Sequence, residues 1–360
     1  MKTTPPMGLV LVLGIGACQP APSGPLWPDQ SAVLEQAKAT TSARVAKGEN
    51  VDTKGTLRVG YNPSNRTQLL TQLEQMGALA GAPISLHWPV GRHGTHLVPA
   101  FSVQPTDDDD DGEGGGLLRG SARVLGPQLA AAMVEDRLDC AIMGSGTLLV
   151  TLSGGLDWTA LAHIGSKSPS DEGFSLWVRD GLDYAGGTSL HGRSLVSMAA
   201  GPMTQMAVYA LIESLGADRN QIQIDAQMQR SEMKHRLSDN ATDFVFASTH
   251  GAERVAASGH FRKLPLPTSA FVDVALNQDL LVCTAAALEA HEDAAVSLLA
   301  AIYGSTVPPA PAQWAPDLAG LTTLEGLLAH HGMLTLPALS RMTPPDALQQ
   351  RAAMLARQDN

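Results

Sequence analysis

The chain has 360 residues, of which 44% are hydrophobic and 16% are charged, so it has room for roughly two domains and is too apolar for wholesale disorder. Its formal net charge is -11, and it offers no Lys- and Arg-dense face to replace counterions along a phosphate backbone. These properties exclude a nucleic-acid-binding surface.

Residues 1–18 have the pattern of a signal peptide. Lys2 precedes the short apolar run Met7–Leu13, and Ile15 is followed by the small residues Gly16 and Ala17 directly before Cys18. The run is too short to cross a bilayer, which takes about 20 apolar residues. The order resembles a bacterial lipobox, in which Cys18 would become the lipidated first residue of the mature protein. An ordinary secretory signal with an incidental Cys18 is the alternative.

A tether and the first predicted elements follow. Residues 19–54 are Pro-rich and then polar, which is typical of a flexible tether. The run "TLRVGY" predicts a strand, and apolar residues from Leu69 to Leu79 predict a helix closed by Gly81. "ISLHW" predicts the next strand, after which residues 91–123 form an acidic loop by composition.

The alternation of helices and strands then resumes. The sequence predicts a helix over about Pro127–Leu138, the strand "CAIM", a turn at Gly144–Thr147 and a short helix ending near Gly154. It then predicts strands at "WTALAHI", "FSLWV" and "SLVSMA" and a helix that begins at Gly201-Pro202.

The last third of the chain continues this pattern. After the strand "IQIDA" come a helix around Ser231–Leu237, the strand "FVFA" and a helix that begins near Ser248. "RKLPLP" and "DLLVCT" predict strands, Ala285–Tyr303 predicts one apolar helix, and helices follow the break at Val307-Pro308-Pro309. Such alternation predicts an α/β protein with one or two mostly parallel sheets flanked by helices.

Four strand-to-helix turns share one composition, with small hydroxyl or amide side chains at the start of a helix. Helix N-termini leave N–H groups and a partial positive charge facing outward, so together these turns could bind an anionic or zwitterionic ligand. The alternative is that these residues only cap their helices. The turns are Asn62-Pro63-Ser64-Asn65, Gly144-Ser145-Gly146-Thr147, Ala200–Gln205 and Ser248-Thr249.

The order of these motifs resembles the nitrate/sulfonate/taurine-type substrate-binding proteins of bacterial ABC importers. The matching segments are "LRVGYNPS", "MVEDRLDCAIMGSGTLL", "LHGRSLVSMAAGPMTQMAVYALIESLGADRNQIQI" and "EMKHRLSDNATDFVFASTHGAERVAASGHFRKL". They cover roughly residues 55–305. The sequence departs from the family pattern at Leu138-Asp139, where a small residue usually precedes the Asp, and in the acidic insertion.

The resemblance implies a two-lobed periplasmic-binding-protein fold that closes around a ligand. It implies lobe I over 55–165, lobe II over 166–248, a return to lobe I over 249–305 and a helical segment over 306–360. Carried over by position, the ligand-binding residues are Asn62, Ser64 and Ser145 on lobe I, Gly201, Thr204 and Gln205 on lobe II, and Ser248 and Thr249 near the crossing.

The resemblance also implies a function. The expected protein is a monomeric, lipid-anchored solute-binding protein on the periplasmic side of the membrane, which delivers a small molecule to ABC permease subunits. It would need no cofactor and catalyse no reaction. A sensory or interaction lipoprotein that keeps the fold without transport is the alternative, and an enzyme of this fold is a third.

Other chemical signals are incomplete. Ser145 lacks the flanking glycines of a nucleophile elbow, and Asp107–Asp111 lacks the Glu at the twelfth position of a calcium loop, where Leu118 stands. The sequence spacing of the histidines predicts no metal site. Cys140 and Cys283 lie in apolar runs, which favours buried thiols, although their pairing in a disulfide stays open.

Overall fold

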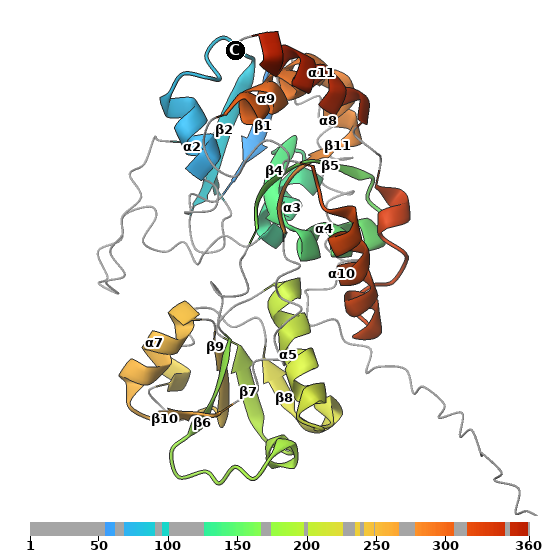
Figure 1. Cartoon of the computed structure of the whole chain (residues 1–360). Helices are drawn as coiled ribbons and strands as arrows, with labels where there is room; N and C mark the ends of the chain where they lie inside the picture. Colours follow the sequence, from blue (N-terminus) through green and yellow to red (C-terminus); the bar gives the residue numbers. More distant parts are fainter. Residues whose placement is uncertain are drawn as a thin grey trace, which may run out of the picture.

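The computed structural model contains two sheets, each with its own helices, arranged as two lobes (Figure 1). The residues that it describes are 55–61, 68–90, 96–100, 126–166, 174–197, 201–225, 235–237, 241–247, 249–265, 278–305, 315–342 and 346–358. The proposed signal peptide, Cys18, the tether and the acidic stretch Asp107–Asp111 lie outside these ranges.

The first lobe is built on a six-stranded sheet with the order β3-β2-β1-β4-β11-β5. Its centre, β2-β1-β4, is parallel as predicted, whereas β3, β11 and β5 pair antiparallel with their neighbours. The sheet is therefore mixed and not mostly parallel. The strands are β1 (Leu57–Gly60), β2 (Ile84–Val90), β3 (His96–Pro99), β4 (Cys140–Gly144), β5 (Trp158–Ser166) and β11 (Gln278–Thr284).

The second lobe repeats this plan on a five-stranded sheet with the order β10-β6-β9-β7-β8. Here β8-β7-β9 is parallel, and β6 and β10 are antiparallel additions at one edge. The strands are β6 (Ser175–Arg179), β7 (Ser194–Ser197), β8 (Gln223–Asp225), β9 (Phe244–Ala247) and β10 (Phe261–Lys263).

Helices flank both sheets. In the first lobe they are α2 (Gln68–Gln75), α3 (Gly126–Val134), α4 (Ser145–Ser153), α8 (Ala285–Ala290), α9 (Glu292–Gly304), α10 (Leu318–His330), α11 (Asp346–Gln358) and the short η5 (Leu339–Arg341). In the second they are α5 (Pro202–Ser214), α7 (Thr249–Ser258), η1 (Gly187–Leu190) and η2 (Arg219–Gln221). No helix among the described residues is long and apolar enough to cross a membrane.

Helices α2 and α8 end earlier than their apolar patterns predict, and so does α3, which stops at Val134 and not near Leu138. Helix α2 stops at Gln75, because Gly77 takes a left-handed φ of 70° and closes the helix before Gly81 is reached. The predicted single helix over Ala285–Tyr303 is two helices, since His291 leaves helical geometry and α9 begins with the acidic pair Glu292-Asp293.

The second lobe extends further along the chain than residues 166–248. Helix α7 packs against β9, and β10 pairs with β6, so both belong to the second sheet. The chain rejoins the first sheet only at β11, which lies between β4 and β5. The second lobe is therefore an insertion between β5 and β11.

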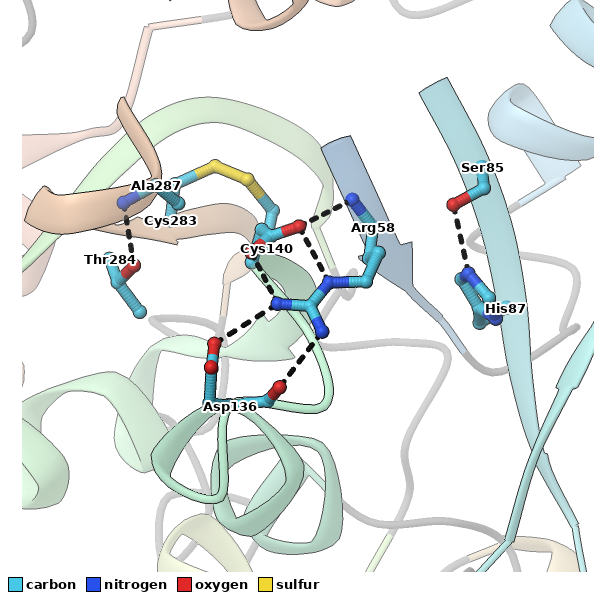
Figure 2. Close-up of polar contacts among 9 residues, drawn as sticks. Arg58, Ser85, His87, Asp136, Cys140, Cys283, Thr284 and Ala287 are labelled. Atoms are coloured by element: carbon cyan, nitrogen blue, oxygen red, sulfur yellow. Dashed lines mark hydrogen bonds and ion pairs between the residues drawn. A yellow bond between two sulfur atoms is a disulfide. The ribbon is translucent and has the colours of Figure 1, made fainter. Parts of the chain in front are cut away.

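A disulfide joins Cys140 of β4 to Cys283 of β11 (Figure 2). The expectation of two buried free thiols was therefore wrong. The two residues lie directly opposite each other in the antiparallel pair, and both side chains are fully buried. The bridge closes a loop of sequence separation 143 that contains the whole second lobe, so it fixes the strand pair from which that lobe is inserted.

A carboxylate at the start of β4 fixes the neighbouring strand β1. Asp139 is buried, and its carboxylate accepts hydrogen bonds from Nε and Nη2 of Arg58, at 2.9 and 2.8 Å. It also accepts one from the backbone N–H of Arg58, at 2.7 Å. Arg58 also reaches Asp136, as Figure 2 shows. This buried, bidentate ion pair sets the register of the parallel pair.

Asp243 occupies the same position at the start of β9 in the second lobe. It accepts a hydrogen bond from Nη2 of Arg179 at 2.8 Å and one from the backbone N–H of Ser194, the first residue of β7, at 3.1 Å. Both aspartates lie at the amino ends of parallel strands, away from the turns predicted to bind ligand, so their role is structural.

Candidate functional site

The four predicted turns all follow strands at the centre of the two sheets. Asn62 and Ser145 come after β1 and β4, where the strand order of the first sheet reverses. Gly201 and Thr249 come after β7 and β9, at the corresponding reversal in the second sheet. In α/β sheets this is the crevice in which ligands bind.

Helix α4 begins directly at the carboxyl end of β4. Its N-cap residue is Gly144, which has no side chain with which to cap the helix. Ser145 is fully buried, and its Oγ accepts a hydrogen bond from the backbone N–H of Gln278 at 3.1 Å. This hydroxyl therefore holds β11 against the start of α4. The N–H groups of the first turn have no acceptor within the helix.

Helix α5 begins in a similar way. Gly201 is its N-cap, with a φ of 130° that disfavours any side chain, and Pro202 is the first helical residue. Gly201 likewise has no side chain with which to cap its helix. By contrast, Thr284 caps α8 and Asp317 caps α10 through hydrogen bonds of 3.1 Å. Capping thus does not account for the polar residues of these two turns.

Two polar side chains are buried in the first turn of α5. Thr204 is 8% exposed and Gln205 is 7% exposed. Nε2 of Gln205 donates to the hydroxyl of Tyr209 at 2.8 Å, one turn further along α5. Burial raises the pKa of Tyr209, so its hydroxyl stays neutral and available as an acceptor.

The starts of α4 and α5 meet between the lobes. A β-carbon at Gly146 would lie 2.9 Å from Cγ and from Sδ of Met203, so any larger residue there would require the Met203 side chain to move. Met206, on the next turn of α5, is buried in the core of the first lobe. A β-carbon at Gly126, the first residue of α3, would lie 2.7 Å from Oγ1 of Thr147. Three helix N-termini therefore converge at this junction.

The remaining predicted residues are only partly described. Asn62, Ser64 and Ser248 lie outside the described residues. Thr249 is the first residue of α7, but its side chain is not described. Their proximity to the α4–α5 junction stays a prediction.

Sequence reasoning missed one cluster of polar residues. Glu213, at the end of α5, contacts His330 and His331 at the end of α10. The adjacent histidines are visible in the sequence, but Glu213 precedes His330 by 117 positions, and no local pattern connects them.

No protein-family model matches the sequence, and no curated protein matches it at a significant level. Among solved structures, a ligand-binding component of an ABC-type import system from Staphylococcus aureus, with zinc bound, has a TM-score of 0.53 at 13% identity. The alignment covers 83% of this chain and 99% of that one.

Two sulfonate-binding proteins have similar TM-scores and identities to this chain. The alkanesulfonate-binding protein from Xanthomonas axonopodis pv. citri, bound to MOPS, has a TM-score of 0.51 at 12% identity, over 81% of this chain and 98% of that one. A putative periplasmic sulfonate-binding protein from Methylobacillus flagellatus has a TM-score of 0.53 at 13% identity. That alignment covers 84% of this chain and 94% of the other. These likenesses confirm the predicted two-lobed fold.

Proposed function

We propose that this chain is a solute-binding protein of the cell envelope, which binds a small anionic or zwitterionic molecule between its lobes and delivers it to an ABC permease. Binding and lobe closure constitute the whole mechanism, so no side chain is assigned a catalytic role. The two-lobed fold supports this proposal, because each lobe contributes the end of a parallel strand pair to the junction.

The approach of α4 to α5 is the observation that carries the proposal. Two helices have glycine as the N-cap residue, so that residue supplies no side-chain cap, and they face each other across the lobes at Gly146 and Met203. Their first-turn N–H groups and the positive ends of their dipoles suit an anion bound by neutral donors. Closure would let both helices donate to the same ligand.

The proposed ligand contacts come from both lobes. Since the Ser145 hydroxyl bonds to Gln278, we assign the contribution of the α4 turn mainly to its backbone N–H groups. In the second lobe the Gly201 backbone, Thr204 and Gln205 would complete the contact. Asn62, Ser64, Ser248 and Thr249 stay candidates from the adjoining turns.

Sulfonates are the first ligand class to test. Two structures with this fold are named as sulfonate-binding proteins, and one of them holds MOPS, which carries a sulfonate and a cationic amine. A sulfonate offers three acceptor oxygens and a single negative charge, which matches a site built from N–H and hydroxyl donors.

We further propose that Cys18 carries the lipid anchor, and that residues 19–54 let the folded lobes reach a permease from the membrane surface. Metabolic labelling with a radioactive fatty acid would test the anchor. Label in the wild-type chain and none in Cys18→Ser supports it, whereas equal label in both overturns it.

Native mass spectrometry of residues 19–360, exported behind a cleavable signal and purified gently, tests ligand binding. A stoichiometric small-molecule adduct that is lost on denaturation would support the proposal and give the mass of the ligand. An unliganded chain that shows no thermal shift with MOPS, other sulfonates, nitrate or amines would favour the sensory or interaction lipoprotein instead.

A further inference from the structure

Three metal-binding side chains lie together at the junction of the lobes, those of Glu213, His330 and His331. Their donor atoms all lie within 4.8 Å of one another. Oε2 of Glu213 is 3.1 Å from Nε2 of His330 and 3.9 Å from Nδ1 of His331. We propose that these side chains bind a divalent transition-metal ion of the Zn²⁺ type, and that the ion fastens α5 to α10.

The donor set and its spacing suit such an ion. Imidazole nitrogen with one carboxylate oxygen is a common ligand set for Zn²⁺, with bonds of about 2.0–2.2 Å. Tetrahedral bonds of that length place ligand atoms about 3.3 Å apart. The two distances from Glu213, 3.1 and 3.9 Å, lie near this value and all three donor atoms lie within 4.8 Å, so rotation of the exposed Glu213 and His330 side chains would complete the site. Three protein ligands leave a fourth position for water.

One ligand is held firmly, and the other two are accessible. His331 is 7% exposed, and its backbone N–H donates a hydrogen bond to the carbonyl of Leu327. Its own carbonyl accepts a hydrogen bond from Nη1 of Arg219 at 3.0 Å. Its ring packs against Tyr209, with centroids 6.0 Å apart. The Glu213 and His330 side chains are 61% and 60% exposed, so an ion can reach them from solvent and they can adjust around it. A fixed histidine lowers the entropy lost on binding.

The cluster spans the two lobes. Helix α10 buries Leu321, Leu324 and Leu328 in the core of the first lobe, and its end approaches α5 of the second (Figure 1). On α5, Gln205, Tyr209 and Glu213 are spaced four residues apart and therefore share one helix face. A bound ion would thus restrain the lobes relative to each other, on the same face as the proposed ligand contact Gln205.

Zinc titration of the full chain against a chromophoric chelator tests the proposal. We expect one Zn²⁺ per chain, with Ca²⁺ and Mg²⁺ failing to compete because these ions prefer oxygen ligands. Glu213→Gln and His330→Ala should each weaken binding at least about tenfold, since the first replaces a charged ligand by a neutral amide and the second removes an imidazole ligand. His260→Ala, at an exposed histidine of the same lobe as Glu213, is the matched control and should bind zinc like the wild type.

The melting temperature gives a second readout. Both exposed substitutions should leave the metal-free melting temperature nearly unchanged, whereas zinc should raise it in the wild type and not in Glu213→Gln. No zinc binding by the wild type overturns the proposal. Unchanged affinity in Glu213→Gln and His330→Ala also overturns it, because the ion would then occupy other histidines. Neither result bears on the binding of sulfonates at the α4–α5 junction.

Discussion

Gly146 of α4 faces Met203 of α5 so closely that a β-carbon at Gly146 would lie 2.9 Å from Cγ and Sδ of the methionine and 3.4 Å from its backbone nitrogen. The two residues belong to different lobes and to the first turns of their helices. This contact therefore depends on how the lobes are positioned relative to each other.

Gly146→Ala should weaken ligand binding, because the added methyl group must displace the Met203 side chain where the lobes meet as in this structure. Overpacking at a close contact costs about 1–3 kcal/mol, which corresponds to about a 5- to 150-fold loss of affinity if it falls on the closed state. Melting temperatures with and without ligand separate this loss of affinity from any change in the stability of the unliganded chain. Calorimetric titration with MOPS or the ligand identified by mass spectrometry measures the effect.

Gly326→Ala is the control for this substitution. Gly326 lies in α10, and a β-carbon there meets no heavy atom within 4 Å. It should gain helix stability and keep full affinity. Equal affinity in both variants would show that the Gly146–Met203 contact plays no part in closure.

Thr204→Val should lower ligand affinity by about 10- to 100-fold, because it removes a hydroxyl that we expect to donate to a charged ligand, a bond worth about 1.5–3 kcal/mol. The side chain keeps its shape, so the melting temperature of the unliganded chain should change little. Thr204→Ser retains the hydroxyl and should keep most of the affinity. A large loss of stability with unchanged affinity would make Thr204 a structural residue.

Ser145→Ala should lower the free energy of unfolding by about 1–3 kcal/mol, since it leaves the buried N–H of Gln278 without its acceptor. Urea denaturation measures this loss. Ser297→Ala is the matched control, because that hydroxyl donates to the carbonyl of Asp293 within its own exposed helix surface. A similar, small effect in both variants would contradict the structural role of Ser145.

Replacing Cys140 and Cys283 together by Ala should lower the free energy of unfolding by about 2–5 kcal/mol. The sequence separation of 143 makes the closed loop long, so the bridge removes much entropy from the unfolded chain. Denaturation with and without dithiothreitol provides the measurement. The reductant should destabilise the wild type but leave the double variant unaffected. An unchanged free energy of unfolding in the fully reduced wild type would contradict the prediction.

The stability should fall as the pH drops from 7.5 to 5, in part through His87. Burial lowers the pKa of His87, the charge of Arg58 lowers it further, and the ring contacts Oγ of Ser85 at 2.9 Å (Figure 2). The folded state thus favours the neutral ring. This stabilisation is complete above the ordinary histidine pKa of about 6.5, and it is lost as the pH falls through the lower folded value.

His87→Gln should therefore reduce the slope of unfolding free energy against pH in this range. Urea denaturation at several pH values gives the slope, and His260→Gln, at an exposed histidine, serves as the control. An unchanged slope in His87→Gln would assign the pH dependence to other groups.

Much of this fold follows from local sequence patterns. Short apolar runs predicted strands such as β1 and β4, and glycine with proline marked the start of α5 at Gly201. These features depend on residues near each other in the chain, and so does the polar composition of the turns after β1, β4, β7 and β9. Once a parallel arrangement was inferred, those turns were expected to meet.

The tertiary structure alone decided which residues pair across the chain. The Cys140–Cys283 bridge depends on β11 returning antiparallel beside β4, and the Ser145 bond depends on where Gln278 ends that strand. The edge strands became antiparallel, and α7 and β10 joined the second lobe, for the same reason. Strand pairing over long separations is set by the packing of whole sheets, and short windows of sequence carry little information about it.

The cluster of Glu213, His330 and His331 shows the same division between local sequence and long-range packing. His330 and His331 are adjacent in the chain, but two histidines without a carboxylate predicted no site. The packing of α10 on the first lobe brings their rings to Glu213 of the second. Sequence periodicity therefore determined which elements form, and long-range packing decided which side chains the lobes bring together.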